Sequence, residues 1–324
     1  MPDDTAPKLT VFRDGLIPAL TLYLAVYLLA AALSVSRQLS SPAIVHLLQS
    51  AALLLAALWL APRLPRRWAA MALALFAVLL AIHSGAQAIL WFGSGGTIQK
   101  FRLGSSDANT IAALFSLMAL ACLPYAIKRP QLRWMVAGSV LIVFATLSRG
   151  AWVGLMAGLT VGWSLSPSAE TRHGRFVMPA IIALTLAGLV VAGFQRSYLT
   201  SGRDEYWRAA LSMFRSSPLI GTGPDTFILF YNSSQPHAHS MLLQAASEAG
   251  ITGLAAGGWL AAEVVYALWL RRSDPLARGM LSACAGLAVH GLVDTPMWDP
   301  WVAGLMVLLL GLALGSSSLG PYKP

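Results

Sequence analysis

The chain has 324 residues, of which 57% are hydrophobic and only 11% are charged, and its mean hydropathy is +0.67. A soluble domain of this size carries about 25% charged residues, so the composition excludes an ordinary soluble protein. The net charge of +9 is not by itself a sign of nucleic-acid binding, because in a membrane protein the position of the charges decides their meaning.

The apolar residues fall into blocks of about twenty, as in transmembrane helices, and not into alternating strands of roughly ten as in a β-barrel. The sequence therefore predicts an all-α polytopic membrane protein with about ten transmembrane helices. The predicted spans are 15–35, 43–62, 68–92, 107–127, 132–148, 151–167, 176–194, 240–270 with a possible break near Gly250, 275–293 and 299–316. The first block is long for a cleavable signal peptide, so we expect a retained helix.

These spans divide one integrated domain into three parts. Residues 1–194 form an N-terminal bundle of seven spans, 195–239 form a long loop, and 240–324 form a C-terminal bundle of three spans. Within the loop, the pattern of Asp204–Phe214 predicts a short amphipathic helix that lies along the membrane surface. Ser216-Ser217-Pro218 ends that helix, and Gly221-Thr222-Gly223-Pro224 forms a tight turn.

The basic residues orient the bundle. With both termini in the cytoplasm, 14 of the 22 lysines and arginines lie on the cytoplasmic side, as the positive-inside rule requires. Cations kept on the outer face indicate an anionic ligand there. The eight on that side are Arg37, Lys100, Arg102, Arg149, Arg196, Arg203, Arg208 and Arg215.

The sequence contains no spacing typical of a metal site. It has no HExxH or DxD motif, and its two cysteines, Cys122 and Cys284, lie inside apolar blocks where they are expected to pack. We therefore expect neither a metal nor another cofactor.

Two histidines, His237 and His239, lie where the loop re-enters the membrane. Histidine is the usual general base for a hydroxyl group, and we take His239 as the catalytic candidate and His237 as an accessory residue. The alternative is an interfacial histidine that bonds to the backbone.

Three arginines are candidates for holding the anion. Arg149 lies between two spans, where a charge is costly unless it has a function, although it could instead reach the outer headgroups. Arg203 and Arg208 lie on the loop helix, where they could alternatively pair with Asp204 or Glu205 on a solvated face.

Further residues are accessory candidates. We expect Lys100, Arg102 and Arg215 to assist the arginines or to contact anionic lipid. Glu248 would accept a bond from the backbone or from an arginine, and Asp294 or Asp299 would orient His239 or an arginine. His83 and His290 lie inside spans and are expected to be packing residues. Guanidinium groups suit the oxygens of phosphate and pyrophosphate, so these cations with one base predict transfer from a pyrophosphate leaving group to a hydroxyl.

These motifs resemble those of the O-antigen ligase and polymerase superfamily. His239-Ser240, nine further residues and Gly250-Ile-Thr-Gly253 match the histidine motif of the ligases. Arg149-Gly-Ala-Trp-Val153 resembles the first arginine motif, with valine in place of leucine. The order of the remaining landmarks is also similar: Arg203, Trp207, Pro218, Gly221-Thr-Gly223 and Phe227.

The resemblance implies a GT-C-like membrane glycosyltransferase in a bacterial inner membrane, with its active site facing the periplasm. It implies a glycan donor linked to undecaprenyl pyrophosphate, bound by Arg149 and Arg203 with Arg208, and an acceptor activated by His239. The acceptor would be lipid A core for a ligase, another lipid-linked glycan for a polymerase or a protein serine for an oligosaccharyltransferase. Ligases of this type have about twelve spans, so the shorter chain leaves the acceptor open.

Two other classes of function compete with this one. A flippase for lipid-linked sugars would need ionisable groups deep in its spans and repeated halves, whereas the cations here collect at the outer rim and no repeat is visible. A non-catalytic scaffold for envelope assembly is the third alternative.

Overall fold

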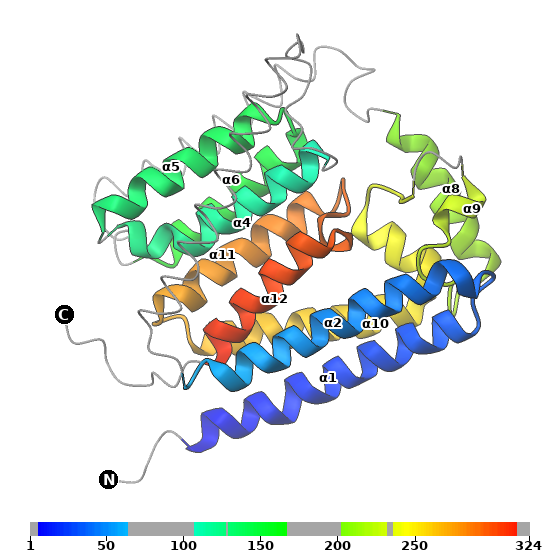
Figure 1. The fold of residues 1–324 in the computed structure, drawn as a ribbon, viewed down its shortest axis with the longest axis horizontal. Helices are drawn as coiled ribbons and strands as arrows, with labels where there is room; N and C mark the ends of the chain where they lie inside the picture. Colours follow the sequence, from blue (N-terminus) through cyan, green and yellow to red (C-terminus); the bar gives the residue numbers. More distant parts are fainter. Residues whose placement is uncertain (1–5, 64–106, 128, 167–201, 232–235, 316–324) are drawn as a thin grey trace.

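A computed structural model describes residues 6–63, 107–127, 129–166, 202–231 and 236–315, and every element in these ranges is a helix (Figure 1). The all-α prediction is confirmed for this part of the chain. The elements are α1 (Ala6–Ala32), α2 (Arg37–Leu60), α4 (Ala108–Ala126), α5 (Pro130–Ala145), α6 (Arg149–Ser164), α8 (Arg203–Ser216), α9 (Phe227–Phe230), α10 (Met241–Leu270), α11 (Pro275–His290), the 3-10 helix η3 (Pro296–Trp298) and α12 (Pro300–Gly315).

Eight of the ten predicted spans coincide with helices, and the other two, 68–92 and 176–194, lie outside the described residues. Among the described residues, four helices are long and apolar enough to cross a membrane, judged by length and composition. They are Gly15–Ala32 within α1, Arg37–Leu60, Ala108–Ala126 and Met241–Leu270. The helices Pro130–Ala145 and Pro300–Gly315 are also apolar but shorter. The count of ten spans stays a prediction.

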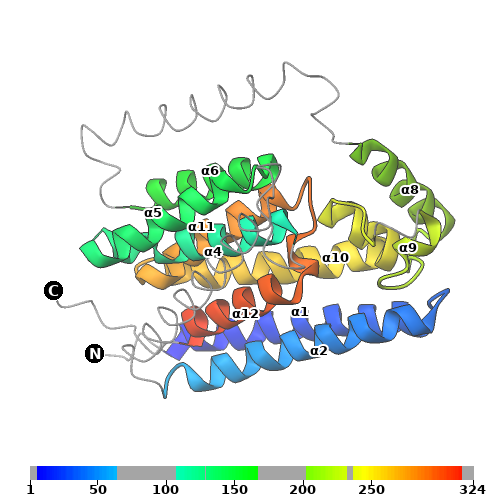
Figure 2. The same ribbon diagram turned by 45° about the horizontal axis from the view of Figure 1, so that its top comes forward.

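Helix α4 is the most deeply buried helix that the structure describes. Two thirds (67%) of its apolar stretch is buried inside the protein, whereas only 28% of the apolar stretch of α1 and of α10 is buried. It packs against α5, α6, α11 and α12. Figures 1 and 2 show α11 and α12 between the α4–α6 helices and the α1–α2 hairpin, with α10 alongside α1. Helices from both ends of the chain therefore form one bundle.

Small residues allow α6 and α11 to approach closely. Gly154 faces Gly286, since a Cβ added to Gly154 would lie 2.5 Å from the Gly286 carbonyl oxygen. One turn further along, a Cβ on Gly158 would lie 2.7 Å from the Ser282 oxygen. Glycines spaced four residues apart bring backbones together in membrane proteins, where close packing replaces the hydrophobic effect. This contact places the N-terminus of α6 beside the C-terminus of α11.

Two cation–π pairs mark one end of the bundle. The guanidinium of Arg63 lies 4.1 Å from the centre of the Trp59 ring after α2, and that of Arg272 lies 4.6 Å from the centre of the Trp269 ring after α10. Tryptophan with a neighbouring arginine is typical of a membrane interface. Both turns belong to the side that the charge distribution assigns to the cytoplasm.

At the opposite end, α10 is broken at Gly250, as the sequence predicts. Gly250 has φ +66° and ψ −162°, outside the helical region. The break exposes main-chain groups that a continuous helix would satisfy internally. The segment Pro218–Gly223 crosses here and pairs with them: Ile251 N–H donates to the Pro218 carbonyl, and Gly223 N–H donates to the Glu248 carbonyl.

The same segment is tied to the first two helices. Val35 N–H, in the turn between α1 and α2, donates to the Thr222 carbonyl at 3.0 Å, and Ser40 Oγ donates to the Pro224 carbonyl at 2.7 Å. The Gly221–Pro224 turn therefore links three parts of the chain that are far apart in sequence.

Candidate active site

The loop helix brings Arg203 to the end of α11. Helix α8 begins at Arg203 after Gly202, whose φ is +77°, and its apolar face packs through the buried Ala210 and Met213. The helix ends at Ser216, within the Ser216-Ser217-Pro218 segment that is predicted to end it. Arg203 donates a hydrogen bond from one guanidinium N–H to the Val293 carbonyl, and its Nη2 lies 3.4 Å from Asp294 Oδ2.

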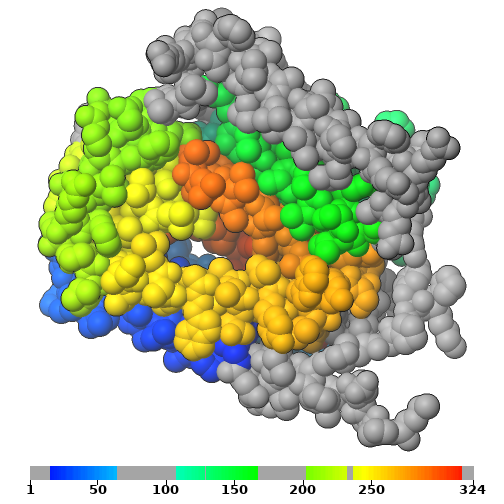
Figure 3. Space-filling view, turned by 180° about the vertical axis from the view of Figure 1, so that it is seen from behind, coloured from blue at the N-terminus to red at the C-terminus, as the bar shows by residue number. Residues whose placement is uncertain are grey.

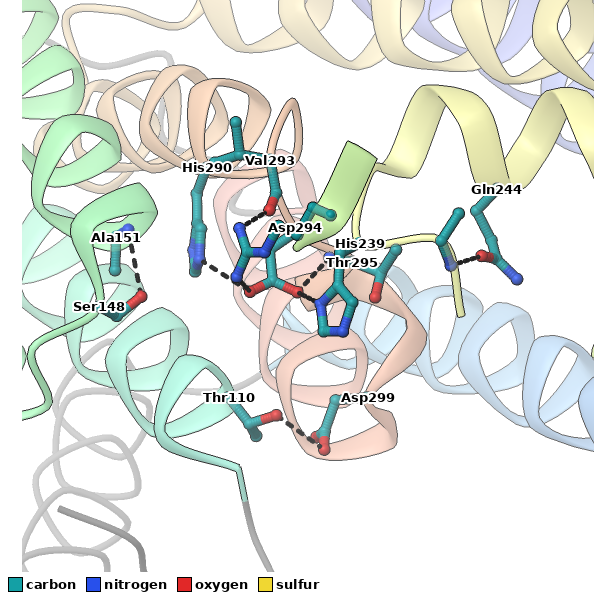
Figure 4. Close-up of polar contacts among 12 residues, drawn as sticks. Thr110, Ser148, Ala151, His239, Gln244, His290, Val293, Asp294, Thr295 and Asp299 are labelled. Atoms are coloured by element: carbon teal, nitrogen blue, oxygen red, sulfur yellow. Dashed lines mark hydrogen bonds and ion pairs between the residues drawn. The ribbon is translucent and has the colours of Figure 1, made fainter. Parts of the chain in front are cut away.

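His239 lies against the same carboxylate. Its Nδ1 is 3.1 Å from Asp294 Oδ1 (Figure 4). A hydrogen on Nδ1 that is donated to Asp294 places the lone pair on Nε2, which fixes the tautomer that a general base needs. The ring also lies 5.4 Å from that of Tyr206, and Trp207 Nε1 donates to the His239 carbonyl at 3.4 Å.

The backbone of His239 is held in an uncommon conformation. Its φ is +50°, and only three described non-glycine residues have a positive φ. Another is Leu147 (φ +55°), two residues before Arg149. Left-handed backbone in a residue other than glycine costs free energy, and such residues cluster at active sites. Both segments that supply candidate groups therefore contain a strained residue.

Asp294 is the common partner of these groups. It is only 5% exposed, and its Oδ1 accepts a further hydrogen bond of 2.8 Å from Thr295 N–H. Burial acts to raise the pKa of Asp294, but the hydrogen bond from His239 and the positive charge of Arg203 outweigh it and lower the pKa to about 2. Asp294 is therefore a carboxylate at neutral pH.

A buried glutamine holds the histidine segment in place. Gln244 is fully buried, its Oε1 accepts from Ala238 N–H at 2.6 Å, and its Nε2 donates to Glu248 Oε1 at 2.6 Å. Ala238 lies between the two histidines, so this bond fixes the backbone that carries both. Met241 N–H donates to the Gly291 carbonyl at 2.7 Å, which joins the start of α10 to the end of α11.

Arg149 approaches the cluster from α6. It is the first residue of that helix, and Ser148 is the cap, with its Oγ accepting from Ala151 N–H. A Cβ on the adjacent Gly150 would lie 2.7 Å from Val293 Cγ2, so the start of α6 lies directly beside the residue that binds Arg203. The charges of Arg149 and Arg203 repel each other, which an anion between them would relieve.

His237 lies beside His239 with its ring roughly perpendicular, at 4.5 Å between ring centres. Its Nδ1 is buried and makes no hydrogen bond to the residues that the structure describes. Burial, together with the charge of His239, lowers the pKa of His237. His237 is therefore neutral at pH 7.

Several predicted residues are not brought to this cluster. The Arg208 side chain is 72% exposed and pairs with Asp204 at 3.0 Å, which is the solvated alternative considered above. Arg215 is also exposed. Glu248 accepts from Gln244 Nε2 and from the backbone of Asp225 and Phe227, which is the backbone alternative, and among the described residues it bonds to no arginine. Lys100 and Arg102 lie outside the described residues.

Of the two aspartates considered from the sequence, Asp294 contacts His239 and Arg203, whereas Asp299 caps α12. Its Oδ1 accepts from Trp301 N–H at 2.9 Å.

Sequence reasoning missed two residues of the cluster. His290 was expected to be a packing residue with its polar groups satisfied, but its Nε2 lies 3.9 Å from Asp294 Oδ2. The spacing of four residues between His290 and Asp294 at a helix end was the available signal. No sequence pattern pointed to Gln244, because its role depends on where the 195–239 loop folds back onto the start of α10.

Among the described residues, no group of three or more histidines, cysteines, aspartates or glutamates is arranged to hold a metal ion.

Part of the chain is similar to a known protein family. The O-antigen ligase family (Wzy_C) matches residues 134–256, a stretch that runs from α5 to the first part of α10. It contains Arg149, Arg203 and His239, whereas Asp294 and His290 lie beyond it. A comparison with curated proteins gives no match. The resemblance drawn from the sequence motifs is therefore confirmed over this stretch: residues 134–256 are similar to the O-antigen ligase family.

Proposed function

We propose that the protein is a membrane glycosyltransferase of the O-antigen ligase type. It would transfer a glycan from an undecaprenyl-pyrophosphate carrier to an acceptor hydroxyl at the periplasmic face of a bacterial inner membrane. The observation that carries the proposal is the cluster of His239, Asp294 and Arg203, in which a base, its orienting carboxylate and a phosphate-binding group meet.

His239 acts as the general base. The acceptor O–H gives its proton to Nε2 while Asp294 holds Nδ1–H and stabilises the imidazolium that forms. The deprotonated oxygen attacks the anomeric carbon of the glycan. The bond between that carbon and the pyrophosphate oxygen breaks, and its electron pair leaves with undecaprenyl pyrophosphate. A single displacement of this kind inverts the anomeric configuration.

Arg149 and Arg203 stabilise the leaving group. Pyrophosphate gains negative charge as the bond to the sugar breaks, and guanidinium groups placed beforehand stabilise that charge. A guanidinium has five N–H donors, so Arg203 can keep its bond to Val293 and still bind a phosphate oxygen. In this proposal the arginines supply the charge stabilisation that a metal ion supplies in many phosphate enzymes.

The lipid tail of the donor lies between the helices. Figure 3 shows the surface hollowed between α10 (yellow) and α11 (orange), with α12 (red) visible at its floor. Since α10 begins directly after His239 and α11 ends shortly before Asp294, a tail in this hollow would leave its headgroup near the cluster.

The acceptor stays open among three chemistries: lipid A core, a second lipid-linked glycan and a protein serine. The match to the O-antigen ligase family does not distinguish among them. All three present a hydroxyl group to the same base, so the mechanism does not depend on the choice.

An in vitro assay tests the proposal. Purified protein is incubated with undecaprenyl-pyrophosphate-linked glycan and each acceptor in parallel, and the wild type should transfer glycan to one of them. His239→Ala should abolish transfer and retain donor binding, while His46→Ala, which changes an exposed histidine on α2, should remain active. Full transfer by His239→Ala would contradict the assignment.

A further inference from the structure

His290 is a buried histidine whose polar atoms have no hydrogen-bond partner. It is 2% exposed, and neither ring nitrogen makes a hydrogen bond to the residues that the structure describes. It is the last residue of α11, and its ring lies against α6, since a Cβ on Gly150 would lie 3.1 Å from His290 Cδ2.

Packing alone does not account for a histidine at this position. A buried N–H without a partner lowers the stability of the folded protein, whereas an aromatic hydrocarbon of similar shape would fill the same space without that cost. Buried polar groups that lack partners are rare, and each one calls for an explanation, of which a role in catalysis is one.

The nearest polar atom is the carboxylate oxygen that Arg203 also contacts. His290 Nε2 lies 3.9 Å from Asp294 Oδ2, just beyond hydrogen-bond distance, and Arg203 Nη2 lies 3.4 Å from the same oxygen. Figure 4 shows the ring of His290 pointing toward Asp294. Asp294 Oδ1 is occupied by His239 and by Thr295 N–H, so only Oδ2 has alternative partners.

We propose that His290 is a positioning residue that takes over Asp294 Oδ2 when Arg203 turns toward the donor pyrophosphate. A shift of less than about 1 Å converts the 3.9 Å contact into a hydrogen bond donated by Nε2–H. The buried carboxylate then keeps a partner and continues to hold His239 in its tautomer and orientation. This inference rests on the proposed function, in which Arg203 binds the pyrophosphate.

The experiment uses full-length protein in the same transfer assay and compares two variants. His290→Phe keeps an aromatic ring but removes both nitrogens. His290→Gln places an amide N–H near the position of Nε2. We expect His290→Phe to lower kcat about 10-fold, the scale of one hydrogen bond to a charged group, with little change in KM for the donor. His290→Gln should restore most of kcat.

Thermal unfolding separates this role from packing. His290→Phe should leave Tm unchanged or raise it, because it removes an unsatisfied buried polar group. Leu287→Ala is the control for packing, since it removes a buried apolar side chain from the same helix. It should lower Tm and leave kcat unchanged.

A double-mutant cycle gives the second readout. In an Asp294→Asn background, His290→Phe should cause no further loss of kcat, because His290 acts through Asp294. Three results would each overturn the inference: wild-type kcat in His290→Phe, additive losses in the cycle, or a loss of kcat that follows a lower Tm and is not restored by glutamine. If His239→Ala remains active, the proposed function itself fails. Each of the three results above would overturn only the role of His290 and leave the proposed function standing.

Discussion

The two oxygens of Asp294 serve different tasks. Oδ1 accepts from His239 and from the backbone of Thr295, whereas Oδ2 faces Arg203 and His290. One carboxylate therefore links the proposed base to the proposed phosphate-binding group. The sequence restricted the orienting carboxylate to two aspartates but could not choose between them, because they lie five residues apart in one turn and only the fold decides which faces the loop.

Asp294→Asn should lower kcat by about 100-fold or more, because the neutral amide no longer holds the correct tautomer of His239 or stabilises its charged form. The comparison is Asp299→Asn, which changes the cap of α12 and should leave kcat close to wild type. Equal activity of the two variants would remove Asp294 from the mechanism.

The same carboxylate makes stability depend on pH. Since the pKa of Asp294 is lowered to about 2, its ionised form contributes stability above about pH 3.9, and that stability is lost as pH falls through about 2.

Arg149→Lys keeps the charge at the start of α6 but loses the fork of donors that matches a phosphate group. Donor use, measured as kcat/KM for the lipid-linked glycan, should fall about 10-fold or more, the scale of one charge-assisted hydrogen bond. Arg37→Gln is the control, since Arg37 is an exposed arginine on the same predicted side that bonds to Ala32. An unchanged kcat/KM in Arg149→Lys would argue against a bidentate contact.

Removal of divalent metal tests the role given to the arginines. If Arg149 and Arg203 supply the charge stabilisation, transfer should continue at the same rate after treatment with EDTA. A loss of activity that Mg²⁺ or Mn²⁺ restores would show that a metal ion shares that task.

At the scale of the elements, the helices were predictable and their ends partly so. Runs of apolar residues located eight of them, and Gly250 located the break in α10. The sequence could not show that the Gly221–Pro224 turn fills this break, because the pairing joins main-chain groups about thirty residues apart. Glycine is needed at both places: Gly221 has φ +78°, and a Cβ on either glycine would collide with the opposing backbone.

Gly250→Ala should therefore destabilise the protein and lower transfer, because φ +66° with ψ −162° is a region open essentially to glycine alone and costs alanine about 1–3 kcal/mol before the collision with Leu219 is counted. Gly258→Ala lies on the same helix with open space around the new Cβ and should be neutral or stabilising. Thermal unfolding of both variants provides the measurement. A Tm for Gly250→Ala at or above that of Gly258→Ala would contradict the account of the break.

At the scale of the whole molecule, the charge distribution and the fold divide the helix bundle into the same two ends. The turn between α1 and α2 is tied to the loop and lies at the same end as His239 and Asp294. The Arg63 and Arg272 turns lie at the other end (Figure 2). The assignment of these ends to periplasm and cytoplasm comes from the sequence alone. The joining of Arg149, Arg203, His239 and Asp294 could not be foreseen in detail, because it depends on the close packing of α6 on α11.

Cysteine labelling tests the orientation. Gln38→Cys, exposed at the start of α2, should react with a membrane-impermeant maleimide from the periplasm, whereas Ser273→Cys, exposed between α10 and α11, should react only after the membrane is opened. Wild-type protein is the control for the native Cys122 and Cys284. The reverse pattern would place His239 on the cytoplasmic side and contradict the proposed location.

Asp294 lies 38 residues beyond the end of the matched O-antigen ligase domain at 256. The proposed base and its carboxylate therefore lie on opposite sides of the boundary of the family match. A chain with every motif of residues 134–256 and another residue at the position of Asp294 would still match the family, and under the proposed mechanism its histidine would be a much weaker base. The proposal therefore makes the turn after α11 a determinant of catalytic power that the family match does not report.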